Sequence, residues 1–185
     1  MNHRISTLLF HHAYETGTFI LANGGVASEY LDVKNAILHA TAGWELAVET
    51  AHAFGACRAV AGVAVGGAML ARLVSSIRSK PCLVVRPEVK SYGKQRQIDG
   101  VRNLSKYNEP GDAVETVLIE DVITTGKSVV TALHALAREV PQCKVTEVIA
   151  VCDREADGLA YLRQEFPAIK FTALVTLSEV RSIQP

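Results

Sequence analysis

The chain has 185 residues, of which 49% are hydrophobic, and its 19 basic residues balance 19 acidic ones. Balanced charge argues against a general affinity for nucleic acid or an anionic membrane, and no apolar run approaches the roughly 20 residues of a membrane span. The length predicts a single domain, residues 1–185. We expect a cytoplasmic protein, because the N-terminus lacks a signal-peptide core. Four scattered cysteines indicate neither a disulfide framework nor a zinc site.

The N-terminal part of the chain predicts one helix, a strand-like segment and then a longer helix. Residues 5–14 form the first pattern, and 19–21 run into a tight turn at Asn23-Gly24-Gly25. Apolar residues then recur at helical spacing from Ile37 to Ala51, including Trp44, which we expect in the core. His11 and His12 lack a third ligand nearby, so solvated helix residues are the better interpretation.

Strand and helix patterns alternate from residue 58 to residue 175. Strands are expected at 58–63, 81–86, 116–121, 144–151 and 171–175, with helices following most of them. This alternation predicts an α/β fold with an open, mostly parallel, twisted sheet flanked by helices. Ligands in such sheets bind beyond the carboxyl ends of the strands.

The stretch from Thr116 to Val129 carries the strongest functional signal. An apolar run leads to Glu120 and Asp121, and the small-residue turn Thr124–Ser128 opens onto a helix. Backbone N–H groups at a helix N-terminus bind phosphate, while carboxylates accept hydrogen bonds from sugar hydroxyls or hold a hydrated magnesium ion. The pattern favours a phosphorylated sugar. A helix cap followed by a turn is the alternative interpretation.

Two other features accompany this stretch, and one motif is excluded. The turn Val65-Gly66-Gly67 lets backbone approach an anion, although close helix–strand packing explains it equally well. A cationic segment with Arg86, Lys90, Lys94 and Arg96 suits a loop that neutralises a polyanion, or a solvated arm. An ATP-binding P-loop is excluded, because Asp121 stands where that motif needs glycine.

Glu120 to Ser128 closely resembles the 5-phosphoribosyl-1-pyrophosphate (PRPP) binding motif of type I phosphoribosyltransferases, in the version found in orotate phosphoribosyltransferases. Residues 19–34 resemble the N-terminal hood of that family, and 86–93 resemble its catalytic loop. Two positions depart from the pattern. Ala22 and Pro87 stand where many members have lysine. The resemblance implies an N-terminal helix and hood at about 1–34 and a mobile catalytic loop at about 87–105.

The resemblance implies transfer of ribose 5-phosphate from PRPP to orotate, with Mg²⁺ held by PRPP and water rather than directly by protein. It assigns catalysis to Lys90, Arg86 and Asp121. It assigns PRPP binding to Arg86, Lys90, Tyr92, Glu120, Asp121, Val122, Ile123, Thr124, Thr125, Gly126, Lys127 and Ser128, and the pyrophosphate loop to Val65, Gly66 and Gly67. Orotate falls to Thr124 and Arg154, since an arginine fork suits a carboxylate.

The resemblance also implies a homodimer in which the basic loop reaches the neighbouring site. Two alternatives stay open from the sequence. One is a phosphoribosyltransferase for another nucleobase, which Arg154 disfavours. The other is a non-catalytic PRPP-binding regulator, which Ala22 and Pro87 favour. From the residues alone, Arg154 pairs equally well with Asp153 or the next helix.

Overall fold

A computed structural model describes residues 2–20, 24–88, 96–100, 104 and 113–183. The predictions for Ala22, Lys90 and Tyr92 lie outside these ranges. Within them, none of the helices is long and apolar enough to cross a membrane.

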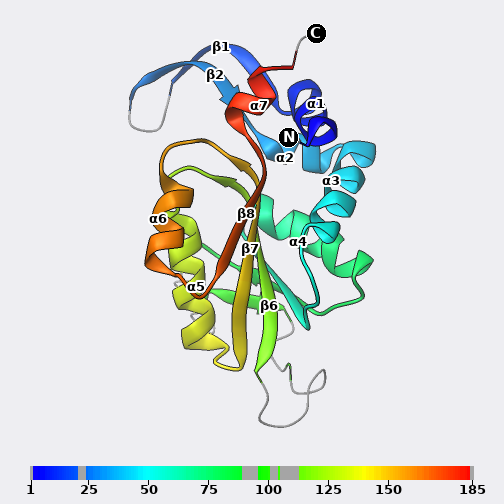
Figure 1. Cartoon of the computed structure of the whole chain (residues 1–185), viewed down its shortest axis with the longest axis vertical. Coiled ribbons are helices and arrows are strands. Elements are labelled where there is room, and N and C mark those ends of the chain that lie inside the picture. Colours follow the sequence, from blue (N-terminus) through cyan, green and yellow to red (C-terminus); the bar gives the residue numbers. More distant parts are fainter. Residues whose placement is uncertain (1, 21–23, 89–95, 101–103, 105–112, 184–185) are drawn as a thin grey trace.

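The centre of the molecule is a six-stranded sheet with the order β5-β4-β3-β6-β7-β8 (Figure 1). Its strands are β3 (Ala59–Val63), β4 (Cys82–Val85), β5 (Ile98–Gly100), β6 (Val114–Ile123), β7 (Cys143–Asp153) and β8 (Lys170–Thr176). All neighbouring pairs are parallel except β4 and β5. The predicted fold class is therefore confirmed, and the antiparallel edge strand β5 is an addition that the polar sequence around it concealed.

Helices cover both faces of the sheet because side chains along each strand alternate between the faces. On β6, Val117 and Ile119 pack in one apolar cluster, whereas Leu118 packs in the other. The first cluster takes residues from α1 (His3–His12), α2 (Val33–Leu38), α3 (Ala40–His52), α4 (Gly66–Ile77) and α7 (Leu177–Arg181). The second takes residues from α5 (Lys127–Glu139) and α6 (Gly158–Glu165). The two clusters fix the sheet from both sides.

The hood is a separate antiparallel hairpin of β1 (Tyr14–Ile20) and β2 (Val26–Leu31). It lies at the same end of the molecule as α7 and α1 (Figure 1). The sequence indicated only a short strand-like segment here, and it did not indicate α7.

The long helix predicted from Ile37 to Ala51 is wrong in two respects. The helix is interrupted at His39, whose extended backbone separates α2 from α3. Its ring Nδ1 accepts a hydrogen bond from Ala42 N and so begins a new helix. The buried face of α3 includes Ala42, Leu46 and Ala47 but not Trp44. Trp44, expected in the core, is consequently 53% exposed.

Candidate active site

Glu120 and Asp121 lie on the central strand of the sheet, among the last four residues of β6. The strand continues to Ile123, two residues beyond the end that the sequence indicated. Glu120 is only 4% exposed. One of its oxygens accepts a hydrogen bond from Ser128 Oγ at 2.8 Å, and the other accepts one from Asp121 N at 3.1 Å. The two acids and the first turn of α5 thus form one connected unit.

Burial changes the protonation of Glu120. Loss of solvent around the carboxyl, reinforced by a hydrogen bond to Asp121 and by the charge of Asp121, raises the pKa of Glu120 to about 9. The hydrogen bond from Ser128 opposes this shift without cancelling it. Burial beside Asp121 thus favours the protonated form of the Glu120 carboxyl.

The two glycines at the start of α4 pack directly against the two acids. A Cβ atom at Gly66 would clash with the carboxylate of Asp121, and one at Gly67 would clash with the carbonyl oxygen of Ile119 and lie 2.9 Å from Glu120 Cα. Val65, the residue before them, is exposed, and the Ala64–Val65 peptide is cis. The structure therefore brings the predicted pyrophosphate loop beside the predicted ribose acids. The tight contact of Gly67 with β6 is also what the alternative interpretation, close packing of helix and strand, predicts.

The turn between β6 and α5 presents backbone N–H groups at the start of a 13-residue helix. Gly126 has a φ of 79°, and no side chain caps the first turn of α5. Thr124, Thr125, Lys127 and Ser128 are exposed around it. Uncapped amides, a positive helix end and exposed hydroxyls form an arrangement that can bind phosphate.

Arg154 follows β7, the strand next to β6. Its backbone N–H donates to Ile123 O at 2.9 Å, which fixes it beside the phosphate turn. The carboxylate of Asp153 accepts a hydrogen bond from Glu155 N, not from the side chain of Arg154. The carboxylate of Glu155 accepts one from Ser178 N, at the start of α7, at 2.8 Å. The Arg154 turn is thereby tied to the same end of the molecule as the hood.

The hood is attached through Glu29 of β2. This carboxylate pairs with the guanidinium of Arg181 on α7 and accepts a hydrogen bond from Tyr14 Oη at 2.6 Å. The Arg181 hydrogen bond lowers the pKa of Glu29, against the effect of partial burial, and the charge of Arg154 contributes in the same direction. Glu29 thus lies within electrostatic reach of Arg154.

Besides Arg154, a second cation, Lys34, lies on α2, the helix that follows the hood. Its ammonium lies 2.6 Å from the carboxylate of Asp32. This hydrogen bond raises the pKa of Lys34 despite partial burial, and the charge of Asp121 adds to the shift. The sequence placed Lys34 only within the hood motif. Its proximity to Asp121 depends on how α2 packs against β6.

Arg86 follows β4, and its guanidinium pairs with Asp99 on β5. Together with the ends of β3 and β4 and with Lys127 and Ser128 of α5, it lines a cavity of about 260 Å³. Arg86 and Ser128 therefore border the same space, and Ser128 connects that space to Glu120.

Residues 27–165 match the family model described as the phosphoribosyl transferase domain. The chain belongs to this family. It is 36% identical over 180 residues to the orotate phosphoribosyltransferase of Methanocorpusculum labreanum, covering 97% of this chain and 98% of that one. It is 37% identical to that of Sorangium cellulosum, covering 86% and 83%.

The fold agrees with solved structures. The orotate phosphoribosyltransferase from Aeropyrum pernix superposes with a TM-score of 0.72 at 26% identity, covering 91% of this chain and 90% of that one. The mostly parallel sheet of this phosphoribosyltransferase, with its flanking helices, thus agrees with the fold of a solved orotate phosphoribosyltransferase.

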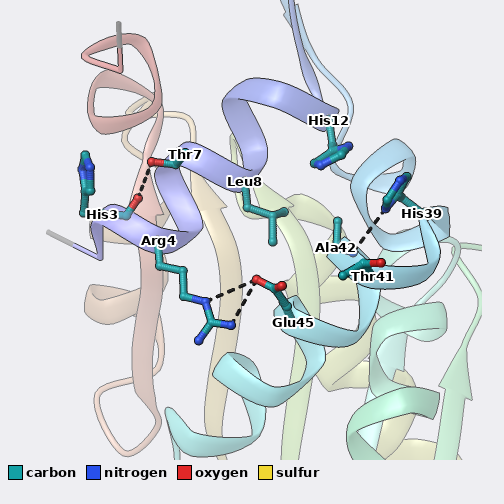
Figure 2. Close-up of a pocket in the computed structure, with 9 residues that line it drawn as sticks. All are labelled: His3, Arg4, Thr7, Leu8, His12, His39, Thr41, Ala42 and Glu45. Carbon is teal, nitrogen blue, oxygen red and sulfur yellow. Dashed lines mark hydrogen bonds and ion pairs between the residues drawn. The ribbon is translucent and has the colours of Figure 1, made fainter. Parts of the chain in front are cut away.

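A second hollow in this phosphoribosyltransferase lies away from the acids. It has a volume of about 630 Å³ and is open to solvent between α1 and the start of α3. Arg4 points across it to Glu45, and the rings of His12 and His39 face one another with centroids 4.4 Å apart (Figure 2). None of the acids or phosphate-turn residues lines it, so we do not assign it to the site.

Several polar residues of this site were missed from the sequence. Glu29, Asp99 and Arg181 form ion pairs with residues elsewhere along the chain, and the pair Arg181–Glu29 spans 152 positions. Lys34 pairs with Asp32 nearby, but its proximity to Asp121 arises only in the fold. Only a pattern linking such distant positions could have indicated them. Lys90 and Tyr92, assigned from the resemblance, lie outside the described residues, so their roles stay predictions.

Proposed function

We propose that this phosphoribosyltransferase transfers ribose 5-phosphate from PRPP to orotate, giving orotidine 5′-monophosphate and pyrophosphate in pyrimidine nucleotide synthesis. One observation carries the proposal. Two acids on the central strand join directly to an uncapped helix end, and an arginine follows the adjacent strand. The orotate phosphoribosyltransferases that match over nearly the whole chain support the choice of base.

The ribose-phosphate half of the substrate is assigned to β6 and α5. The amides of the Thr124–Ser128 turn, with its hydroxyls, bind the 5′-phosphate. Glu120 and Asp121 offer carboxyl oxygens to the ribose hydroxyls. Ser128 Oγ, which donates to Glu120, couples the two subsites. The sugar is therefore held by its phosphate and hydroxyls, with the anomeric carbon left free to react.

Charge stabilisation supplies the rest of the chemistry. Positive charge develops at the anomeric carbon as pyrophosphate departs, and catalysis rests on positioning and electrostatics. We assign the departing pyrophosphate to Arg86, Lys90 and the backbone of Val65–Gly67. We assign the orotate carboxylate to the guanidinium of Arg154, which would bind it in a bidentate manner, and we also assign Thr124 to orotate.

We propose Mg²⁺ as the cofactor, held by PRPP and water beside Glu120 and Asp121. These residues fit that role, since the acid pair offers oxygen donors, which Mg²⁺ prefers while keeping several waters. The described residues contain no cluster of three or more His, Cys, Asp or Glu residues suited to direct coordination. When bound, Mg²⁺ neutralises the pyrophosphate oxygens.

We also propose a homodimer. Leu38 and Trp44, on the consecutive helices α2 and α3, are among the large apolar side chains most exposed in the described chain. Burial of such residues against a second copy would remove apolar area from water. Light scattering of the wild type and of Trp44→Glu tests this. A monomeric mass for the wild type at enzyme-assay concentrations would contradict it.

Purified protein incubated with orotate, PRPP and Mg²⁺ tests the function. We expect orotidine 5′-monophosphate and pyrophosphate in equal amounts. Parallel reactions with hypoxanthine and adenine distinguish a purine enzyme, and PRPP binding without any transfer would identify a regulator. Either outcome contradicts the proposal.

A further inference from the structure

The residue before β5, Gln97, is a buried polar side chain whose hydrogen bonds are unusually complete. It is 6% exposed. Its Nε2 donates to the carbonyl oxygens of Arg86 and Pro87, each at 3.3 Å, and its Oε1 accepts from Arg138 Nη2 at 2.5 Å. Burying an amide is costly unless both of its ends are paired. Here they are paired, and two of the three partners are backbone atoms at the end of β4.

The backbone around Gln97 is fixed as firmly. Arg86 N donates to Gln97 O at 2.9 Å. Gln97 N and Ile98 N donate to the two oxygens of Glu139, at 3.1 and 3.2 Å, at the end of α5. Partial burial would raise the pKa of Glu139, but the Gln97 amide, Arg138 and the Ile98 amide together lower it. The last residues of α5 therefore anchor the start of β5.

Two residues further along, Asp99 holds the side chain of Arg86. Arg86 Nε donates to Asp99 Oδ2 at 2.5 Å, and its Nη2 pairs with the same oxygen. One edge of the guanidinium is thus occupied by Asp99, and Arg86 also lines the cavity between β4 and α5. Gln97 therefore holds the backbone of Arg86, and Asp99 holds its guanidinium group.

We infer that Gln97 and Asp99 are positioning residues for Arg86, which they hold at the rim of the cavity between β4 and α5 so that it binds the pyrophosphate group. The inference rests on the proposed function, which assigns Arg86 to that group. The alternative is that Gln97 and Asp99 stabilise the edge of the sheet without acting through Arg86.

A double-mutant cycle separates the two possibilities. Gln97→Met keeps an unbranched side chain of similar length and removes the donor and acceptor, and Asp99→Asn keeps the shape and removes the charge. Each is made in the wild type and in Arg86→Ala. Binding of inorganic pyrophosphate with Mg²⁺ is measured by titration calorimetry, and folding is monitored by the urea midpoint. Gln164→Met, at an exposed position on α6, is the matched control.

We expect each substitution to weaken pyrophosphate binding about fivefold in the wild type and less than about 1.5-fold in Arg86→Ala, because coupled residues are not additive. The control should leave binding unchanged. The same loss in both backgrounds, or no loss in the wild type, would overturn the inference. Because binding is measured without orotate, the result is independent of whether the protein forms orotidine 5′-monophosphate.

Discussion

The regions that we assign to the phosphate and to the base, called here the phosphate half and the base half, are built by different means. In the phosphate half, consecutive residues of β6 and α5 pack against glycines of α4 so tightly that a Cβ at Gly67 would meet backbone. In the base half, the Arg154 turn, α7 and the hood are joined by polar side chains such as Glu29, Arg181 and Glu155. The first half is fixed by close packing and the second by charge. They should therefore respond differently to substitution, pH and salt.

The largest effect is expected in the phosphate half. Gly67→Ala would force Ile119 and Glu120 to move on the central strand, and overpacking of this kind should lower the free energy of unfolding by about 3 kcal/mol. Urea unfolding measures it. Gly55→Ala is the control, because a Cβ there meets nothing within 4 Å, and a change within about 0.5 kcal/mol is expected. Equal losses of unfolding free energy in the two variants would show that the close packing at Gly67 does not make this site sensitive to an added methyl group.

In the base half, Arg154→Ala should lower kcat/KM for orotate about 100-fold, the loss expected for a charged, two-pronged hydrogen bond. PRPP binding, measured by titration without orotate, should stay within about twofold of the wild type. Arg154→Lys, which keeps the charge without the fork, should recover only part of the activity. An equal loss of PRPP binding would remove the boundary between the two halves.

The burial of Glu120 predicts a pH dependence of stability. Its pKa is higher in the folded protein, about 9, than its ordinary value of 4.5, so its contribution is complete below 4.5 and is lost as the pH rises towards 9. A difference of one bound proton corresponds to about 1.4 kcal/mol per pH unit. Unfolding free energies between pH 6 and 9 should therefore fall more steeply for the wild type than for Glu120→Gln. Parallel profiles would contradict the protonated state.

The smallest effect is expected at the attachment of the hood. Glu29→Gln keeps the shape but removes the charge that pairs with Arg181, an exposed partner whose ion pair contributes little by itself. We expect the KM for orotate to rise about threefold, with little change in the urea midpoint. Glu15→Gln, on the exposed face of the same hairpin, is the control. No difference between the two variants would mean that charge does not position the hood.

The same contrast explains what the sequence could predict. The acids, the phosphate turn and the helix after it are contiguous, so apolar periodicity and glycine spacing place Glu120, Gly126 and Ser128 correctly. The strands β3, β6 and β7 are also indicated by the sequence, because each is a buried and strongly apolar run. The parallel sheet and its helices on both faces could therefore be predicted before any coordinates.

Other features depend on contacts that local patterns do not contain. The helix breaks at His39 because the His39 side chain caps α3, the helix that follows it. The spacing of apolar residues continues across this break and does not indicate it. The strand β5 has only three residues and is recognised by its pairing with β4 rather than by its composition. The partners Glu29 and Arg181 meet only after the chain has folded. Long-range polar contacts are thus the part that the sequence leaves open.

The position of β6 in the middle of the sheet has a consequence for how the protein opens. Backbone hydrogen bonds at the centre of a sheet are among the last to break in partial unfolding, whereas a two-stranded hairpin is marginal by itself. Amide hydrogens of β6 should exchange far more slowly than those of β1 and β2. On warming, the hood would open while the acids and the phosphate turn stay folded. Over a range of temperature the protein would then still bind PRPP but bind the base more weakly.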